Sequence, residues 1–148
     1  MAEVKELVIQ TRLGQRSISA DRIIHFPRGL IGFEQLQRFT LLQIKEDSPF
    51  LLLQSVDDPQ CGLLVADPYS FMDRYEVKVG DSEQKVLKLE SRENVAVLVT
   101  VTIPSGRPEN TTLNLSGPVI INTQTRIGLQ IPQTDPDIPS HFSLSGQA

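Results

Sequence analysis

The fold is decided at residues 26–34, which read Phe26-Pro27-Arg28-Gly29-Leu30-Ile31-Gly32-Phe33-Glu34. Pro27 lacks an amide hydrogen and restricts the residue before it, so a strand that ends at Phe26 should stop there or lie at a sheet edge. The two glycines permit backbone angles that residues with a Cβ avoid. Leu30, Ile31 and Phe33 are too apolar for a solvated loop. The stretch therefore predicts a buried corner that plugs the domain, with these structural residues: Pro27, Gly29, Gly32 and Phe33.

Apolar runs of strand length, separated by turn residues, extend outward from this corner over most of the chain. Residues 95–103 are almost wholly β-branched or apolar, as in a central strand. Residues 81–90 predict the one helix, with Asp81 as its N-cap, and residues 33–39 predict at most one helical turn. The predicted fold class is mainly β, a compact antiparallel or mixed barrel-like or sandwich domain with one short helix. The predicted strands are 7–11, 17–19, 23–26, 40–44, 50–55, 61–66, 75–79, 95–103, 111–115, 119–122 and 127–131.

The chain is long enough for one domain with a core of its own, because it has 148 residues of which 39% are hydrophobic. We expect a single β domain over residues 1–131. Residues 132–148 are rich in proline and polar residues, which predicts a flexible C-terminal tail. The apolar residues of that segment leave an alternative open, in which it docks on the domain or on a partner; they are Ile138, Phe142 and Leu144.

Signals for a membrane or for secretion are missing from the sequence. No apolar run approaches the roughly 18 residues that cross a bilayer. The first six residues lack a basic region followed by an apolar one. The single cysteine, Cys61, excludes an internal disulfide and lies among apolar residues, as a small buried thiol does. We therefore expect a cytoplasmic protein that does not bind membranes.

Charge is unevenly distributed along the chain. Residues 1–45 contain seven basic and four acidic side chains, whereas residues 46–93 contain five basic and eleven acidic ones. An acidic middle segment favours a basic protein partner and disfavours nucleic acid. The chain has no tryptophan, only two tyrosines and no basic cluster interleaved with aromatic residues. Direct nucleic-acid binding is therefore not expected.

The sequence offers little catalytic chemistry, and we predict no catalytic residue, metal site or cofactor. His25 and His141 are the only histidines, and they lie far apart in the sequence, so neither a two-histidine metal site nor a Ser/His/Asp set is suggested. Gly29 and Gly32 do not match a phosphate-binding loop. Four aspartates could in principle hold Mg²⁺ or Ca²⁺, but their positions are also those of ordinary turn formers; they are Asp57, Asp58, Asp67 and Asp73.

Several short motifs occur together in one order. They are Phe26 with Gly29-Leu30-Ile31-Gly32-Phe33-Glu34, Pro49-Phe50 with Leu53-Gln54-Ser55 and Asp57, Asp67-Pro68 with Tyr75, and Asn114-Leu115 with Pro118-Val119-Ile120-Ile121-Asn122. With these motifs in this order, the chain resembles the FliW family of bacterial flagellar assembly factors over most of residues 7–131. The chain departs from the family pattern at Ile31, where many relatives have proline, and in the length of the segment after Pro132.

The resemblance implies a non-enzymatic regulator, monomeric when free, that binds two proteins. These are flagellin and the RNA-binding translational regulator CsrA. While flagellin is unsecreted it occupies the factor; after export, the freed factor binds CsrA and relieves repression of flagellin translation. Inhibition of CsrA is expected at a site apart from its RNA-binding surface, which requires tighter binding to the RNA-free form.

A partner surface is predicted on polar residues that lie next to buried strands. The residues are Gln54, Ser55 and Asp57, followed by Glu34 and Asp67. Two alternatives from other classes stay open at this point. One is a metal-assisted hydrolase that uses Asp57, Asp58 and Asp67, and the other is a structural β module that binds a polysaccharide or another subunit.

Overall fold

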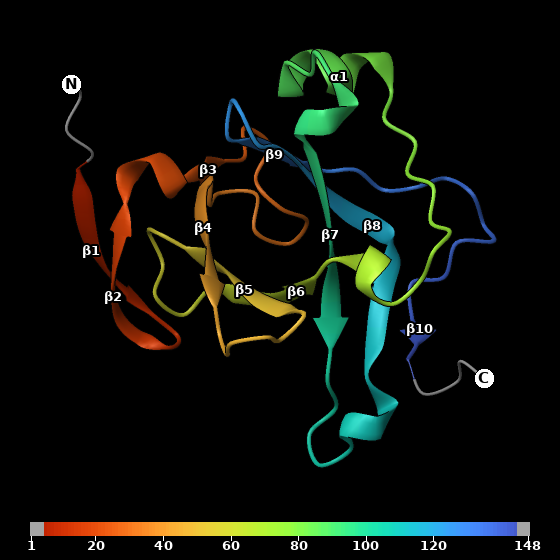
Figure 1. Ribbon diagram of the computed structural model, residues 1–148, viewed down its shortest axis with the longest axis horizontal. Coiled ribbons are helices and arrows are strands. Elements are labelled where there is room, and N and C mark those ends of the chain that lie inside the picture. Colours follow the sequence, from red (N-terminus) through yellow and green to blue (C-terminus); the bar gives the residue numbers. More distant parts are fainter. Residues whose placement is uncertain (1–4, 145–148) are drawn as a thin grey trace.

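The structure, a computed structural model, describes residues 5–144 and is mainly β (Figure 1). Its one α-helix, α1, spans Asp81–Leu87. Short 3-10 turns lie at Ala20–Arg22, Pro68–Ser70, Arg92–Asn94 and Pro108–Asn110. The strands are β1 (Glu6–Thr11), β2 (Gly14–Ser19), β3 (Ile24–His25), β4 (Arg38–Gln43), β5 (Phe50–Ser55), β6 (Gly62–Ala66), β7 (Val95–Thr102), β8 (Thr112–Asn122), β9 (Ile127–Gln130) and β10 (Phe142–Ser143).

Strands β3 to β9 close into a barrel. Neighbours pair antiparallel in chain order from β3 to β9, and the ring closes where β9 pairs in parallel with β3 through His25 and Ile127. Side chains alternate between the inside and the outside of the barrel along each strand. Ile24 and Phe39 pair across β3 and β4 and are fully buried, whereas the next pair, His25 and Arg38, is exposed. The predicted barrel-like class with one short helix is therefore confirmed.

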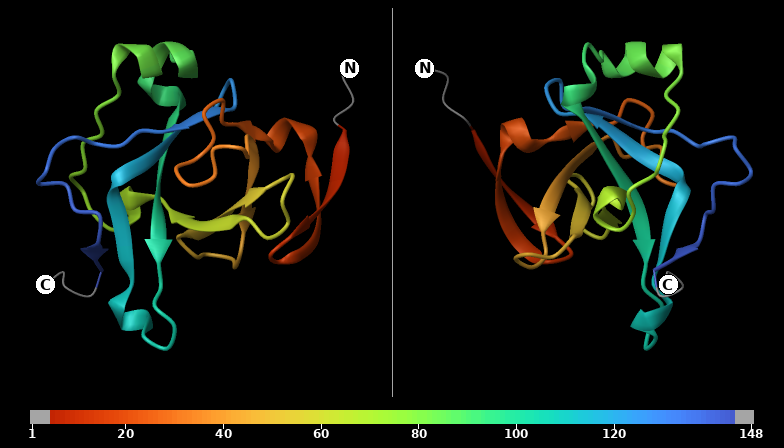
Figure 2. Two further views of the ribbon diagram at one scale, coloured as in Figure 1. Left: turned by 180° about the vertical axis from the view of Figure 1, so that it is seen from behind. Right: turned by 45° about the vertical axis from the view of Figure 1, so that its right-hand side comes forward.

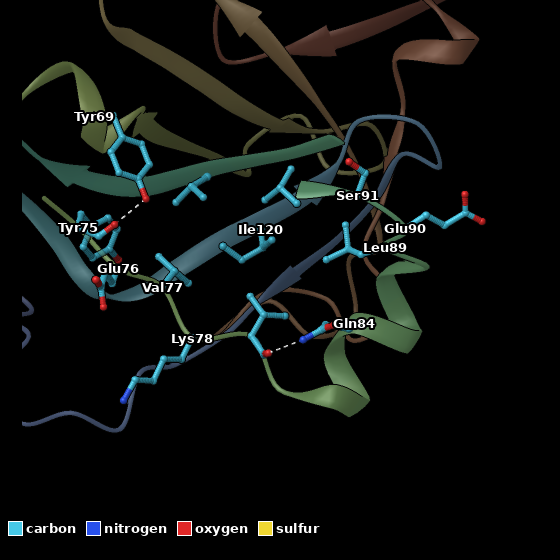
Figure 3. A pocket seen from close by; sticks show the side chains of 13 residues that line it. Tyr69, Tyr75, Glu76, Val77, Lys78, Gln84, Leu89, Glu90, Ser91 and Ile120 are labelled. Carbon is cyan, nitrogen blue, oxygen red and sulfur yellow. Dashed lines mark hydrogen bonds between the residues drawn. The ribbon is translucent and has the colours of Figure 1, made fainter. Parts of the chain in front are cut away.

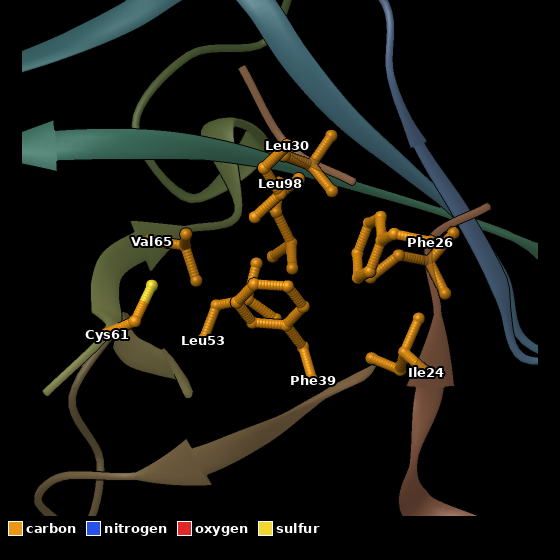
Figure 4. Packing of buried hydrophobic residues seen from close by; sticks show 10 residues of the cluster. Ile24, Phe26, Leu30, Phe39, Leu53, Cys61, Val65 and Leu98 are labelled. Carbon is orange, nitrogen blue, oxygen red and sulfur yellow. The ribbon is translucent and has the colours of Figure 1, made fainter. Parts of the chain in front are cut away.

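The core inside the barrel is a cluster of buried apolar side chains (Figure 4). The rings of Phe26 and Phe39 meet edge to face with centroids 5.4 Å apart. Cys61 is buried in this cluster, as predicted, and burial raises the pKa of its thiol, which disfavours a nucleophilic thiolate. Each large apolar side chain of the cluster, Cys61 aside, contributes roughly 1.5–3 kcal/mol on burial. The members are Ile24, Phe26, Leu30, Phe39, Leu53, Cys61, Val65, Leu98, Val119 and Ile121.

Two further apolar clusters cover the outer face of β7 and β8. The connection between β6 and β7 packs there through Tyr75, whose hydroxyl donates to the Leu115 carbonyl, and through Leu87 of α1. The β1–β2 hairpin forms a separate two-stranded sheet, which lies on the opposite side of the molecule from β10 (Figure 2). The barrel is thus covered by segments from both halves of the chain.

The C-terminal segment docks on the domain through residue 144, so the predicted flexible tail is wrong for the described part of residues 132–148. β10 pairs with β8 through Phe142 and Leu113. The amide of Leu115 donates to the Pro139 carbonyl at 3.1 Å, and Ile138, Phe142 and Leu144 pack in the cluster around Val99. Three apolar side chains suffice because β8 still offers a free edge for pairing. Residues 145–148 of the predicted tail lie outside the described residues.

The segment at residues 75–79 is extended and alternates between buried and exposed residues, but it is not the predicted strand. Its backbone bonds to side chains: the Lys78 amide donates to the Gln133 side chain at 2.9 Å, and the Val79 carbonyl accepts from the Gln84 side chain. The alternation of apolar and charged residues therefore predicted correctly which side chains of this segment are buried. It could not show whether another strand pairs with the segment.

Among the local differences from prediction, three change the description of an element. The helix ends at Leu87, and Gly80 rather than Asp81 is its N-cap, because Gln84 donates its amide to the Gly80 carbonyl. The predicted strands 111–115 and 119–122 are one strand, β8, which continues past Gly117-Pro118 across a register shift in its pairing with β7. Residues 33–36 form a hydrogen-bonded turn rather than a helical one, and β4 begins two residues later at Arg38.

Candidate partner-binding surfaces

The corner at residues 26–34 is anchored by two buried side chains. Phe26 and Leu30 lie in the barrel core, and the Phe26 carbonyl accepts from the Gly29 amide at 2.9 Å. Gly29 and Gly32 have φ of +64° and +89°, so both need the conformational freedom of glycine. A Cβ at Gly29 would lie 2.5 Å from the Glu34 backbone, whereas a Cβ at Gly32 would meet nothing within 4 Å. The corner is therefore crowded at Gly29 and open at Gly32.

The tip of this corner is exposed, which overturns the prediction that its apolar residues are all buried. The Phe33 amide donates to the Leu30 carbonyl at 2.7 Å, so the chain reverses over Ile31 and Gly32. This reversal leaves Ile31 59% and Phe33 39% exposed. Pro27, in the turn before Gly29, is exposed as well. Only one of the three large residues after Gly29 can point into the barrel, and Leu30 is that residue.

Gln54 and Ser55 are not surface residues, so their predicted role in partner binding is corrected. Both are fully buried. The Gln54 side chain accepts from the Arg12 amide at 3.1 Å and donates to the carbonyls of Ser55, Asp58 and Pro59. The Ser55 hydroxyl accepts from the amides of the next turn, at Asp57 and Asp58. These side chains hold the β5–β6 connection and attach the β1–β2 hairpin to the barrel.

Asp57 lies at the surface, and its two carboxylate oxygens accept hydrogen bonds from the guanidinium group of Arg38. The hydrogen bonds from Arg38 lower the pKa of the Asp57 carboxyl. Because the folded-state pKa is lowered, the stabilisation is present above the ordinary aspartate pKa and is lost as the pH falls through the folded-state value. Both side chains are nearly half exposed, so we expect a contribution of only about 0.2–1 kcal/mol at neutral pH.

Glu34 and Asp67 are also exposed, and each carboxylate bonds to its own turn. Glu34 accepts from the Gly32 amide at 3.1 Å, and Asp67 accepts from the Tyr69 amide at 2.9 Å at the start of the 3-10 turn Pro68–Ser70. These bonds leave further carboxylate lone pairs toward solvent. With Asp57, the two residues stay candidates for the partner surface.

The aspartates of the hydrolase alternative do not converge. Asp57 and Asp58 follow the end of β5, and Asp67 follows the end of β6. Because β5 and β6 are antiparallel, these two ends point in opposite directions. Within residues 5–144, no three His, Cys, Asp or Glu side chains lie close enough together to hold a metal ion. Among these residues, no helix is long and apolar enough to cross a membrane.

A hollow of about 840 Å³ lies between residues 75–79 and the outer face of β7 and β8 (Figure 3). Val95, Val97 and Ile120 contribute apolar side chains from the two strands. On the other side, the Tyr69 hydroxyl donates to the Tyr75 carbonyl at 2.7 Å, and this bond closes one end. The Tyr69 and Gln84 side chains thus donate to nearby backbone carbonyls. Sequence analysis did not predict the hollow, because its walls come from segments far apart in the chain.

Comparison with known proteins places the chain in a family. The family model described as FliW protein matches residues 7–144. The chain belongs to the FliW family. The flagellar assembly factor FliW of Nitratidesulfovibrio vulgaris, strain DP4, is 61% identical over 144 residues, which are 97% of this chain and 83% of that protein. The corresponding factor of Desulfovibrio desulfuricans is 53% identical over 135 residues, 90% of this chain and 81% of that protein.

The fold agrees with a solved member of the FliW family. A crystal structure of the flagellar assembly factor FliW aligns with a TM-score of 0.87 at 29% sequence identity, covering 97% of this chain and 99% of the solved one. The family match extends to residue 144, so it includes the C-terminal segment that docks on β8. FliW proteins are flagellar assembly factors and are not known as an enzyme family.

Proposed function

We propose that this FliW-family chain is a flagellar assembly factor that binds flagellin and CsrA in alternation. Unsecreted flagellin occupies the factor in the cytoplasm. When export depletes flagellin, the freed factor binds CsrA and relieves its repression of flagellin translation. The factor acts on CsrA apart from the RNA-binding surface and therefore binds the RNA-free form more tightly than the RNA-bound form. Family membership supports the assembly role, and the charge of one surface supports the choice of a basic partner.

The proposal that CsrA is a partner rests on a segment of the chain that lacks basic residues. Residues 46–73 contain six acidic residues and no lysine or arginine. Glu46 precedes β5 and Asp67 follows β6, and the pairing of Phe50 with Ala66 brings these strand ends together. Asp73 comes to the same end because Phe71 stacks on Phe50 with ring centroids 5.8 Å apart. An acidic surface of this kind accelerates association with a basic, RNA-binding protein.

Charge reversal tests this surface. Glu46 and Asp73 are exposed and their side chains make no hydrogen bond within the described residues, so Glu46→Lys/Asp73→Lys leaves the fold in place. We expect association with CsrA at low salt to slow by about tenfold and to depend less on salt, as measured by stopped-flow mixing. The control Glu109→Lys/Asp137→Lys makes the same change in net charge at exposed positions elsewhere and should stay close to the parent. Equal rates for the two variants would exclude this surface.

The alternation itself is tested by a titration of the chain with CsrA at increasing fixed concentrations of flagellin. Linkage is reciprocal at equilibrium, so flagellin should weaken CsrA binding by the same factor by which CsrA weakens flagellin binding. Calorimetry in both directions measures the two factors. An apparent CsrA affinity that stays constant while a ternary complex accumulates in sedimentation would contradict the switch and would indicate a scaffold that carries both proteins.

A further inference from the structure

We propose that the exposed tip of the corner, Ile31 and Phe33, is a contact site for flagellin. This site is separate from the acidic end of the barrel, which is formed by Glu46, Asp67 and Asp73. The site would take an apolar surface of an unassembled filament subunit. This inference rests on the proposed function and adds to it which surface receives which partner.

Exposure is the first observation that carries this site. Within residues 5–144, the large apolar side chains that are well exposed are Val8, Ile31, Phe33, Ile44, Tyr69 and Ile103. Ile31 and Phe33 are two residues apart, whereas each of the others is more than ten residues from its nearest neighbour in this set. A single exposed apolar residue is ordinary on a protein surface, but a projecting pair with an aromatic member is typical of a binding anchor.

The tip is also held in one conformation. The chain that leads into it is fixed by buried Phe26 and Leu30. The Ile31 amide donates to the Gln130 side chain at 2.9 Å, and that side chain in turn donates to the Gly117 carbonyl at 3.0 Å, which ties the tip to β8 and β9. A surface that is ordered before binding loses little conformational entropy on association.

Charge indicates the kind of partner. The charged residues of the corner, Arg28 and Glu34, are both exposed and have opposite signs, so the tip carries no net charge that would favour a basic partner. A subunit that will be built into a filament exposes, before assembly, surfaces that are destined for large and hydrophobic permanent interfaces. The apolar tip suits such a surface, whereas the acidic end suits a basic protein.

The test compares Ile31→Ser/Phe33→Ser with the control Val8→Ser/Ile103→Ser. The control residues are 62% and 45% exposed and lie on β1 and just after β7, so both variants lose two exposed apolar side chains. We expect the tip variant to bind flagellin at least tenfold more weakly, to bind CsrA within twofold of the parent, and to melt close to the parent temperature. The control should bind both proteins like the parent. Affinities are measured by calorimetry with purified flagellin and purified CsrA.

Each other outcome overturns a specific statement. If the parent binds flagellin and the tip variant binds it equally well, this inference is wrong and the proposed function stands. If the tip variant loses both partners with its melting temperature unchanged, the surfaces are shared rather than separate. If the parent dimerises in sedimentation and the tip variant does not, the occupant is a second copy. If the parent binds neither protein, the proposed function fails and this inference fails with it.

Discussion

Gly128→Ala is expected to lower the free energy of unfolding by about 3 kcal/mol, because it adds a methyl group to the packed barrel core. A Cβ at Gly128 would lie 2.4 Å from the ring of Phe26, a fully buried residue of the barrel core. The ring cannot move outward without disturbing Phe39, which it contacts edge to face. Inserting atoms into a packed core costs typically 1–3 kcal/mol and occasionally more. Urea unfolding followed by circular dichroism measures the change.

A double-mutant cycle with Phe26→Leu identifies the cause. Phe26→Leu removes the ring atoms that crowd Gly128, so Gly128→Ala should cost at least 1 kcal/mol less in that background. Gly117→Ala is the matched control in the adjacent strand, because its Cβ would meet only the ends of two flexible side chains, Gln130 at 3.2 Å and Asn114 at 3.6 Å. We expect Gly117→Ala to cost below about 1 kcal/mol. If the two substitutions change the free energy of unfolding additively, the contact between Gly128 and the Phe26 ring is not the cause of the destabilisation.

The barrel could be predicted from the sequence because its strands carry local signals. The hairpin of β4 and β5 follows from two apolar runs joined by a polar turn, and the long β7 follows from β-branched residues at 95–103. Closure of the ring could not be predicted, because it depends on the single parallel pair of His25 and Ile127, about a hundred residues apart. Local pattern contains no information about which distant edge a strand will meet.

The surface was less predictable than the core, and the corner shows why. Phe26, Leu30, Ile31 and Phe33 have the same apolar character in the sequence, yet two are buried and two are exposed. The difference is set by the reversal between Leu30 and Phe33, whose direction depends on a hydrogen bond to Gln130 on β9. Hydrophobicity alone therefore predicts a plug, and the three-dimensional path of the backbone determines which residues form the plug and which face a partner.

The prediction for two polar residues of β5 failed in the opposite direction, because it placed buried side chains at the surface. Gln54 and Ser55 end an apolar run, which is equally typical of a surface site and of a buried polar network. The network is present because Arg12, 42 positions earlier, donates its amide to Gln54. That contact is not visible in local sequence. Of the predicted partner residues, Asp57, Glu34 and Asp67 are at the surface, where short turns that end in a carboxylate point toward water.

Gln54→Ala should therefore act on stability and not on binding, with an expected loss of about 3 kcal/mol. The substitution removes the partner of the Arg12 amide and of three carbonyls in the β5–β6 connection. A buried polar group left without a partner costs about 1–3 kcal/mol, and water can reach some of these groups once the side chain is gone. Gln43→Ala is the control, because Gln43 is exposed on β4 and should cost below about 0.5 kcal/mol.

Binding and unfolding measurements on Gln54→Ala together distinguish a structural role of Gln54 from a direct contact with a partner. At low temperature, where the variant is folded, its affinity for CsrA and for flagellin should match the parent, because a fully buried side chain does not touch either protein. In chemical unfolding, the midpoint should fall with an unchanged slope, since the native barrel keeps its compactness. A variant that unfolds like the parent and yet loses one partner would return Gln54 to the partner surface, and would mean that binding opens the turn at Asp57 and Asp58 that now covers it.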